Sequence, residues 1–228
     1  MMGALVHIEL RDISYRLGDM HILERINLTV ESGECVSVSG RSGCGKSMLF
    51  SILCGTLAAT EGEVFVNRLA MSQMDHEENQ VFRKYLGAVF QRAALISNLT
   101  VIENLLLPLN LHFPELDEQT KLNRIHAIAS EFGFYNCLEW RTDRMSMGMR
   151  SLAGLARAVL NEPKYLIWDA PLIDVDIHWS GLVKQKLMQI KDSGATIILL
   201  SNRQEFITEL ADRRFTLMAG QLRSRDAV

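Results

Sequence analysis

The segment ECVSVSGRSGCGKSMLFSILCG, residues 34–55, restricts the fold of this chain more than any other stretch of it. Its first part is apolar enough to form a buried strand, and its last part carries Leu49, Ile52 and Leu53 at helical spacing. Between the two, residues 40–47 read GRSGCGKS and match the pattern G-x-x-x-x-G-K-[ST]. The segment therefore predicts a strand, a glycine-rich loop and a helix in direct succession. An ordinary glycine-rich turn is the weaker alternative.

The loop has the chemistry that phosphate groups require. Its glycines free the backbone to curl, so that successive N–H groups point at phosphate oxygens beside the positive end of the following helix. Lys46 adds a point charge, and the hydroxyl of Ser47 can bind a Mg²⁺ ion. We therefore expect the loop to bind the phosphates of Mg-ATP. Its residues are Gly40, Arg41, Ser42, Gly43, Cys44, Gly45, Lys46 and Ser47.

A second candidate metal ligand follows a buried strand. Residues 164–169 read KYLIWD, a continuous apolar run that ends in Asp169. The carboxyl ends of parallel strands meet at one edge of a sheet, so this carboxylate fits the partner that holds the water shell of the metal ion. The next residue is Ala170, which offers a methyl group where a second acid would complete a reaction centre.

Strand-like and helix-like segments alternate along the chain, which is typical of a parallel sheet covered by helices. Residues 195–201 form another continuous apolar run, and residues 178–194 before it carry a helical stripe that stops at Gly194. The N-terminal residues 8–30 and the last strands, which turn near Gly220, alternate as antiparallel strands do. The predicted fold class is therefore α/β.

The middle of the chain differs from its flanks because it is helical. One helix is predicted to open with the capping box Thr100-x-x-Glu103, and a second helical stripe runs up to Gly133. We expect one domain with a helical subdomain inserted into its nucleotide-binding core. The predicted ranges are 1–228 for the domain, 1–91 and 151–228 for the core, and 92–150 for the helical subdomain.

Composition limits the classes of function. The chain has 228 residues, 48% of them hydrophobic and 22% charged, which is enough to bury a full core. Its formal net charge of −3 lacks the electrostatic footprint of a nucleic-acid-binding protein, and its four cysteines form no C-x-x-C pair for a zinc site. No apolar run of about 18 residues and no signal pattern occurs, so we expect a cytoplasmic protein.

Two further segments resemble the ABC ATPase family, and with the loop the resemblance extends over nearly the whole chain. Residues 89–109 read VFQRAALISNLTVIENLLLPL and are similar to the Q-loop and its following helix. Residues 145–163 read MSMGMRSLAGLARAVLNEP and are similar to the signature motif and its helix. The resemblance implies a P-loop NTPase (RecA-like) core with a parallel sheet, an N-terminal antiparallel β subdomain and an inserted helical subdomain. It also implies ATP and Mg²⁺ as cofactors.

The resemblance assigns roles to single residues. Gln91 matches the glutamine that contacts the metal and couples the site to the rest of the protein. Ser146 and Gly148 are the retained residues of the signature motif, and Asp176 fits the D-loop aspartate. The metal ligands implied in this way are Ser47, Gln91 and Asp169.

Within the family, the chain resembles one subfamily. Met149 stands at the fifth signature position, and the pattern FQxxALxxxLTVxENxxxPL occurs between the loop and the signature motif. Both features are similar to the ATPase of Mla-type (Mce-associated) phospholipid transporters. This resemblance implies that the transported molecule is a lipid.

Two departures from the family pattern weaken the expected hydrolysis. The family has a glutamate directly after the aspartate of this strand, and that glutamate orients the attacking water; Ala170 stands there instead. A positioned base is typically worth about 10²–10⁴ in rate. The family's switch histidine is replaced by Asn202, which donates a neutral hydrogen bond but not a charged one. We therefore expect no intact catalytic residue.

Two other departures affect contacts with the nucleotide. In the signature motif Met145, Met147 and Met149 replace leucine, glycine and glutamine, and a methionine costs about 1–2 kcal/mol if position 147 requires a positive φ. The family's adenine-stacking aromatic residue is replaced by Leu17. Tyr15, two residues earlier on the same strand face, is expected either to stack on adenine or to pack against the sheet, with equal weight.

These observations predict the ATP-binding subunit of a membrane ABC transporter, with tight Mg-ATP binding and weak intrinsic hydrolysis. The resemblance implies head-to-tail pairing with a second ATPase subunit, either the same chain or an intact homologue. It also implies a membrane permease as partner, which places the chain at the inner face of the membrane. A non-hydrolysing, ATP-gated scaffold or regulator is the main alternative. A small-molecule P-loop kinase is a weaker one, because Gln91 and the segment 145–163 argue against it.

Overall fold

Two β-sheets and the helices packed on them make up the fold. The computed structural model describes residues 6–170, 177–202 and 209–225. The larger sheet has six strands in the order β10-β9-β3-β8-β7-β6. Neighbouring strands are parallel except for β9 and β10, which pair antiparallel. The bounds are β3 (Cys35–Ser39), β6 (Leu86–Val89), β7 (Tyr165–Asp169), β8 (Thr196–Leu200), β9 (Arg213–Met218) and β10 (Gln221–Ser224).

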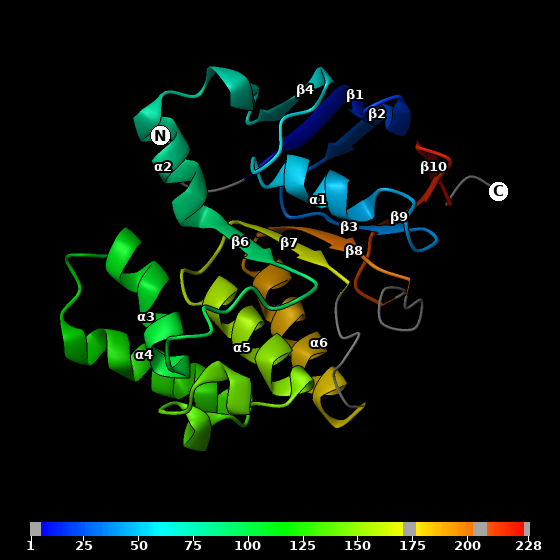
Figure 1. The fold of residues 1–228 in the computed structure, drawn as a ribbon. Coiled ribbons are helices and arrows are strands. Elements are labelled where there is room, and N and C mark those ends of the chain that lie inside the picture. The colour runs from blue at the N-terminus through cyan, green and yellow to red at the C-terminus, as the bar shows by residue number, and fades with distance from the viewer. Residues whose placement is uncertain (1–5, 171–176, 203–208, 226–228) are drawn as a thin grey trace.

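The smaller sheet is antiparallel and has the order β2-β1-β4-β5. Its strands are β1 (Ile8–Leu17), β2 (Met20–Val30), β4 (Glu61–Val66) and β5 (Leu69–Ala70). Helix α1 (Lys46–Leu53) lies between this sheet and the larger one (Figure 1). The N–H of Glu24 donates to the carbonyl oxygen of Gly220 at 2.8 Å, so the turn before β10 is tied to β2.

The central strands of the larger sheet are buried on both faces, as their continuous apolar runs predict. Every residue of β7 and β8 is buried. Along β7, Tyr165 and Ile167 pack with α1 and the smaller sheet, whereas Leu166 and Trp168 pack with the helices on the opposite face. Since both faces of the sheet are covered, the side chain of Asp169 reaches open space only beyond the carboxyl end of β7.

Four helices cover the face of the larger sheet opposite α1, with α5 and α6 against the strands and α3 and α4 farther out (Figure 1). They are α3 (Val101–His112), α4 (Glu118–Glu131), α5 (Met147–Val159) and α6 (Ile177–Asp192). The capping box predicted for α3 is confirmed: Thr100 Oγ1 accepts from the N–H of Glu103, whose carboxylate accepts from the N–H of Thr100. Residue 150, the predicted end of the helical subdomain, lies inside α5.

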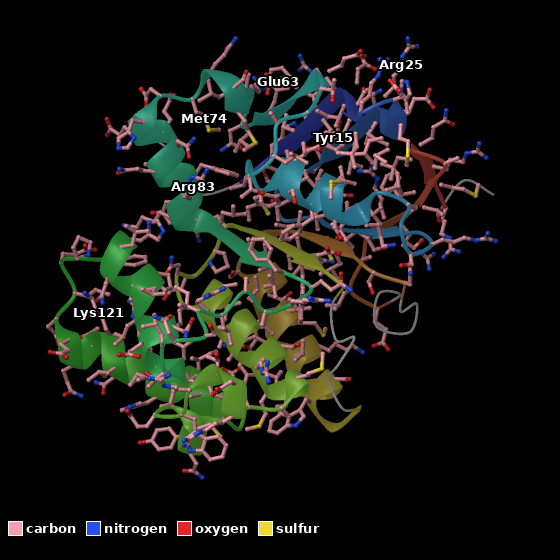
Figure 2. The ribbon with its side chains drawn as sticks, in the orientation of Figure 1. Tyr15, Arg25, Glu63, Met74, Arg83 and Lys121 are labelled. Carbon is pink, nitrogen blue, oxygen red and sulfur yellow. The ribbon has the colours of Figure 1, made fainter. Side chains whose placement is uncertain are left out.

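Polar as well as apolar contacts join α3 to α4. Lys121 of α4 is buried, and its ammonium donates to Oδ1 of Asn110 in α3 at 3.1 Å. Figure 2 shows Lys121 among these helices, far from Tyr15 on the strands of the smaller sheet. Across the described residues, no helix is both long enough and apolar enough to span a bilayer.

The predicted fold class is confirmed, with a parallel core sheet, an antiparallel N-terminal sheet and inserted helices. The strands and the helix expected at 164–169, 195–201 and 178–194 correspond to β7, β8 and α6. The segment between α1 and Gln91, for which the sequence predicts no particular element, contains β4, β5, β6 and α2 (His76–Tyr85). Short 3₁₀ turns lie at Met71–Gln73, Tyr135–Cys137 and Thr142–Arg144.

Candidate functional site

The loop at 40–47 requires glycine at two positions for different reasons. A Cβ at Gly40 would lie 2.4 Å from the carbonyl oxygen of Leu217 and 2.6 Å from Sγ of Cys44, so β9 closes one side of the loop. Gly45 caps α1 with a φ of 104°, a region in which side chains are disfavoured. Helix α1 begins at Lys46, and its first N–H groups open toward the loop. The strand-loop-helix unit predicted from the sequence is therefore confirmed.

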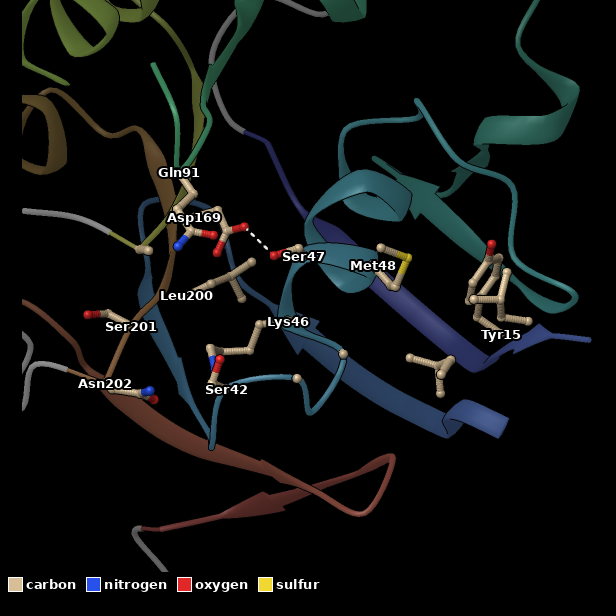
Figure 3. Close-up of a pocket in the computed structure, with 15 residues that line it drawn as sticks. Tyr15, Ser42, Lys46, Ser47, Met48, Gln91, Asp169, Leu200, Ser201 and Asn202 are labelled. Carbon is tan, nitrogen blue, oxygen red and sulfur yellow. Dashed lines mark hydrogen bonds between the residues drawn. The ribbon is translucent and has the colours of Figure 1, made fainter. Parts of the chain in front are cut away.

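A cavity of about 470 Å³ opens between this loop and the carboxyl ends of β7 and β8 (Figure 3). Its walls come from the β1–β2 hairpin, the loop with the start of α1, the residue two positions after β6, and the ends of β7 and β8. The lining residues are Tyr15, Leu17, Ile22, Ser42, Gly43, Gly45, Lys46, Ser47, Met48, Gln91, Asp169, Ala170, Leu200, Ser201 and Asn202.

Ser47 and Asp169 are in direct contact in this cavity. Oγ of Ser47 donates to Oδ2 of Asp169 at 2.7 Å (Figure 3). Asp169 is 5% exposed, and burial raises the pKa of its carboxyl, although the hydrogen bond from Ser47 and the charge of Lys46 oppose the rise. Gln91 lines the same cavity. A hydroxyl, a carboxylate and an amide from three separate segments meet here, and oxygens of these kinds are the ligands that Mg²⁺ prefers.

The ammonium of Lys46 lies on carbonyl groups of its own loop. Nζ donates to the oxygens of Gly40 at 2.5 Å and Arg41 at 3.0 Å, and it lies 3.7 Å from Sγ of Cys44. These contacts hold a positive charge at the wall of the cavity, beside the N–H groups at the start of α1. An anion that enters the cavity would therefore meet a full charge and a helix N-terminus together.

Part of the loop faces a different space. Gly40, Arg41 and Cys44 line a second hollow of about 600 Å³ between the loop and β9, rather than the first cavity. Asn202 borders both spaces. Of the loop residues, the structure therefore brings Ser42, Gly43, Gly45, Lys46 and Ser47 into the cavity wall.

Both positions at which the sequence departs from a hydrolytic site border the cavity. Ala170 has a left-handed backbone with φ 54°, and its N–H donates to the carbonyl oxygen of Leu200 at 2.8 Å. Oδ1 of Asn202 accepts from the N–H of Gly40 at 2.9 Å, which ties the end of β8 to the start of the loop. Ala170 thus places a methyl group where the family pattern has a glutamate. Asn202 places a neutral amide where the pattern has a histidine.

The far end of the cavity is apolar. Tyr15 and Leu17 from β1 line it, and Leu17 is 63% exposed. Ile22 and Met48 complete this wall, and neither was among the residues predicted from the sequence. Met48 directly follows the loop, so its position in the sequence was a usable signal, whereas Ile22 is brought in only by the pairing of β2 with β1. This end can accept a flat apolar group.

Ser146 and Gly148 lie apart from this cavity, at the start of α5. Oγ of Ser146 caps the helix by accepting from the N–H of Met149 at 3.2 Å. Met147 is the first helical residue and is 61% exposed, and its φ is not positive. The strain expected if position 147 required a positive φ is therefore absent. Asp176 lies outside the described residues.

Comparison with known protein families and curated proteins agrees with this geometry. The model of the ABC transporter family matches residues 23–173. An uncharacterized ABC transporter ATP-binding protein of Methanocaldococcus jannaschii is 33% identical over 201 residues, which cover 88% of each chain. A phosphonates import ATP-binding protein of Oceanobacillus iheyensis is 30% identical over 213 residues, 90% of this chain and 84% of that protein. A methionine import ATP-binding protein of Rhizobium johnstonii is 31% identical, but only 59% of its length is covered.

A solved structure shares the fold over nearly its whole length. It is a dimeric ATP-binding cassette in a post-hydrolysis state, bound to ADP and Pi. The TM-score is 0.88 and the sequence identity 25%, with 96% of this chain and 97% of that chain covered. The family match, the relatives and the fold agree, and this chain belongs to the ABC transporter family of ATP-binding proteins.

Proposed function

We propose that this chain binds Mg-ATP between the loop at 40–47 and Asp169, as the ATP-binding subunit of a membrane ABC transporter. The contact between Ser47 and Asp169 carries the proposal. It joins a hydroxyl and a carboxylate at the place where the charge of Lys46 and the N–H groups of α1 converge. The similar cassette bound to ADP and Pi supports the choice of nucleotide.

In this proposal the two ends of the cavity take different parts of the nucleotide. The loop N–H groups and the ammonium of Lys46 bind the phosphates. The apolar end formed by Tyr15 and Leu17 takes the base, with Ile22 and Met48 completing its wall. The large apolar contact area of Tyr15 favours it over Leu17 as the main contact of the base.

The metal is proposed to lie at the opposite end from the base. Ser47, Asp169 and Gln91 would hold a Mg²⁺ ion there, and the ion would neutralise phosphate charge when bound. Oγ of Ser47 already lies 2.7 Å from Oδ2 of Asp169, so both oxygens point at the same small volume. This chain would position these oxygens for the ion, and it has Ala170 where a second acid would otherwise stand.

Intrinsic hydrolysis is proposed to be slow. Ala170 provides no general base, which costs about 10²–10⁴ in rate, and Oδ1 of Asn202 is engaged by the N–H of Gly40. The missing carboxylate also removes like-charge repulsion near the terminal phosphate, so the bound nucleotide is held more tightly. We therefore propose that the protein binds Mg-ATP tightly and hydrolyses it slowly.

The proposed assembly is a head-to-tail pair of ATPase subunits on a membrane permease, at the cytoplasmic face of the membrane. Ser146, Gly148 and Asp176 would then serve the nucleotide of the partner chain. The dimeric state of the similar cassette supports the pairing. Residues 92–150 are proposed to form the helical subdomain that docks on the permease. A phospholipid substrate is supported by Met149 and the pattern FQxxALxxxLTVxENxxxPL alone.

Calorimetric titration of Mg-ATP tests the proposed site. Lys46→Ala is expected to weaken binding by about tenfold or more, because it removes the charge on the phosphates. Lys186→Ala is the matched control, because this lysine forms a surface pair with Glu131 on α4, away from the cavity. A Lys46→Ala variant that binds Mg-ATP as well as the parent does would contradict the proposal.

A turnover assay tests the proposed slow hydrolysis. The parent is expected to hydrolyse ATP well below about 1 s⁻¹, the lower end of the usual enzyme range. Ala170→Glu supplies the absent carboxylate and is expected to raise the rate. A parent rate at or above that limit would show that hydrolysis does not depend on an acid at position 170.

A non-hydrolysing, ATP-gated scaffold or regulatory subunit is the second candidate, favoured by the same pair of residues, Ala170 and Asn202. Purification of the intact complex separates the two functions. A permease in the complex supports the transporter subunit. A complex without a membrane protein, and without turnover, supports the scaffold.

A further inference from the structure

Two side chains outside the cavity hold the segment that delivers Gln91. This segment, residues 91–96, follows β6 and forms neither helix nor strand. Gln91 lines the cavity, whereas the residues after it run between α3 and α5. A segment without regular structure keeps a fixed position only if other groups satisfy its backbone.

On the side of α3, Asn104 satisfies this backbone. Its side chain is 0% exposed. Oδ1 accepts from the N–H of Ile96 at 2.7 Å, and Nδ2 donates to the carbonyl oxygens of Ile96 at 3.0 Å and Thr100 at 2.9 Å. The amide thus exchanges two hydrogen bonds with one residue, as paired backbone does in a sheet. The end of the segment is therefore fixed to α3.

On the side of α5, the helix backbone at Gly154 and the side chain of Arg157 both contact Ala93. A Cβ at Gly154 would lie only 3.0 to 3.1 Å from Cβ, Cα and the carbonyl oxygen of Ala93, so the helix touches the segment directly. One turn farther along, Nη2 of Arg157 donates to the carbonyl oxygen of Ala93 at 3.1 Å. The next residue, Ala94, has a left-handed φ of 48°. The middle of the segment is therefore fixed to α5.

We infer that Asn104 and Arg157 are positioning residues that set the place of Gln91 by fixing residues 91–96 to α3 and α5. Asn104 contacts the N–H and the carbonyl oxygen of Ile96, and Arg157 donates to the carbonyl oxygen of Ala93. The effect on the metal rests on the proposed function, in which Gln91 is a ligand of Mg²⁺. Loosening the segment would move Gln91 but leave Lys46 and the loop in place. The affinity for Mg-ATP would then fall, whereas the affinity for ATP without metal would not.

The experiment compares Asn104→Ala and Arg157→Met with the parent, with Gln91→Ala as the reference for a lost ligand. Affinity for ATP is measured with Mg²⁺ and with EDTA, and deuterium exchange is followed across residues 91–96. In both positioning variants, the ratio of ATP affinity with Mg²⁺ to ATP affinity in EDTA is expected to fall about tenfold. Deuterium exchange in the segment is expected to be about tenfold faster. Affinity in EDTA should stay within about twofold of the parent.

Leu111→Ala is the matched control, because it shortens a side chain of the same helix that is 74% exposed, and it leaves the segment untouched. It is expected to equal the parent in exchange across residues 91–96 and in the gain from Mg²⁺. If Asn104→Ala does not fold, Arg157→Met decides the question, with the same expected results.

Two results would overturn the inference. One is an unchanged exchange rate across residues 91–96 in both positioning variants; the other is an unchanged Mg²⁺ gain despite faster exchange. A parent that takes up no nucleotide at all would refute the proposed function instead. The exchange measurement would then still decide whether Asn104 and Arg157 hold the segment.

Discussion

The carboxyl of Asp169 links the stability of the chain to pH. Burial raises its pKa, and a carboxyl whose pKa is raised by folding stabilises the folded state most below its ordinary pKa of about 3.9. That contribution is lost as pH rises through the pKa of the folded state. We therefore expect nucleotide-free Asp169→Asn, which keeps an acceptor for Ser47, to melt higher than the parent at about pH 7.

Thermal melts between about pH 4 and pH 8 check this expectation, and the difference between the two proteins should narrow toward the acid end. Ser97→Ala, at an exposed position outside the cavity, serves as the control and should follow the parent throughout. Equal melting temperatures for Asp169→Asn and the parent at neutral pH would show that the buried carboxylate does not lower the stability of the folded state.

The hydroxyl of Tyr165 is a second polar group with a measurable effect. It is buried in β7, and it has no hydrogen-bond partner among the residues that the structure describes. An unpaired buried hydroxyl costs about 1–3 kcal/mol, so Tyr165→Phe is expected to raise the free energy of unfolding by about 1 kcal/mol. Urea denaturation measures the change, with the exposed Tyr135→Phe as a control that leaves stability unchanged. A destabilised Tyr165→Phe would reveal a partner for the hydroxyl.

Residues of the site differ in how far the sequence reveals them. Lys46, Ser47 and Asp169 were predictable, because the loop pattern and the end of a buried strand select the residue types that bind phosphate and metal. Asn104 and Arg157 lie in the two segments that resemble the ABC ATPase family, but their role was not predicted, because they contact backbone atoms of a segment that has no periodic pattern. Which backbone group a side chain will contact depends on the fold and not on the local sequence.

Two glycines near α6 differ in how much space a side chain would have. Gly133, at the end of α4, has φ 70°, and a Cβ there would lie 2.0 Å from the ring of Trp179. Gly133→Ala is therefore expected to cost about 3 kcal/mol, from left-handed strain and the displaced ring. Gly181 lies inside α6, with nothing within 4 Å of a Cβ, so Gly181→Ala should gain about 0.5–1 kcal/mol from helix propensity.

Chemical denaturation of both variants measures the contrast, because the two substitutions add the same methyl group, one against the ring of Trp179 and the other at an open position of α6. Opposite signs are expected for the two changes in unfolding free energy. Equal changes would mean that Trp179 moves aside freely and that Gly133 is not required by the packing of α6.

Helix α3 was predicted from its local sequence, whereas helix α2 and strand β6 were not. Helix α3 was predicted from the box Thr100-x-x-Glu103, which the structure confirms. Helix α2 also begins with a capping box, at Asp75 and Glu78, but buries only Phe82, so its polar sequence has no clear apolar stripe. Strand β6 has four residues and depends on its pairing with β7, which a local pattern does not reveal.

At the scale of the whole molecule, the proposed site predicts a change in mass. Without a catalytic acid, a pair closed on Mg-ATP should persist, so light scattering with Mg-ATP is expected to give twice the 25.8 kDa of the chain. Lys46→Ala under the same conditions should remain at 25.8 kDa. A parent mass that does not change in saturating Mg-ATP would contradict a stable pair made of two copies of this chain.

Helix α1 is enclosed by both sheets, and the loop at 40–47 leads directly into its first turn. A ligand bound at that turn stabilises the packed layers, because it must dissociate before the helix unfolds. Proteolytic lifetime in the cell should then follow the local supply of ATP. A subunit that hydrolyses ATP slowly would then persist in cells with a high ATP concentration and be degraded faster in cells depleted of ATP.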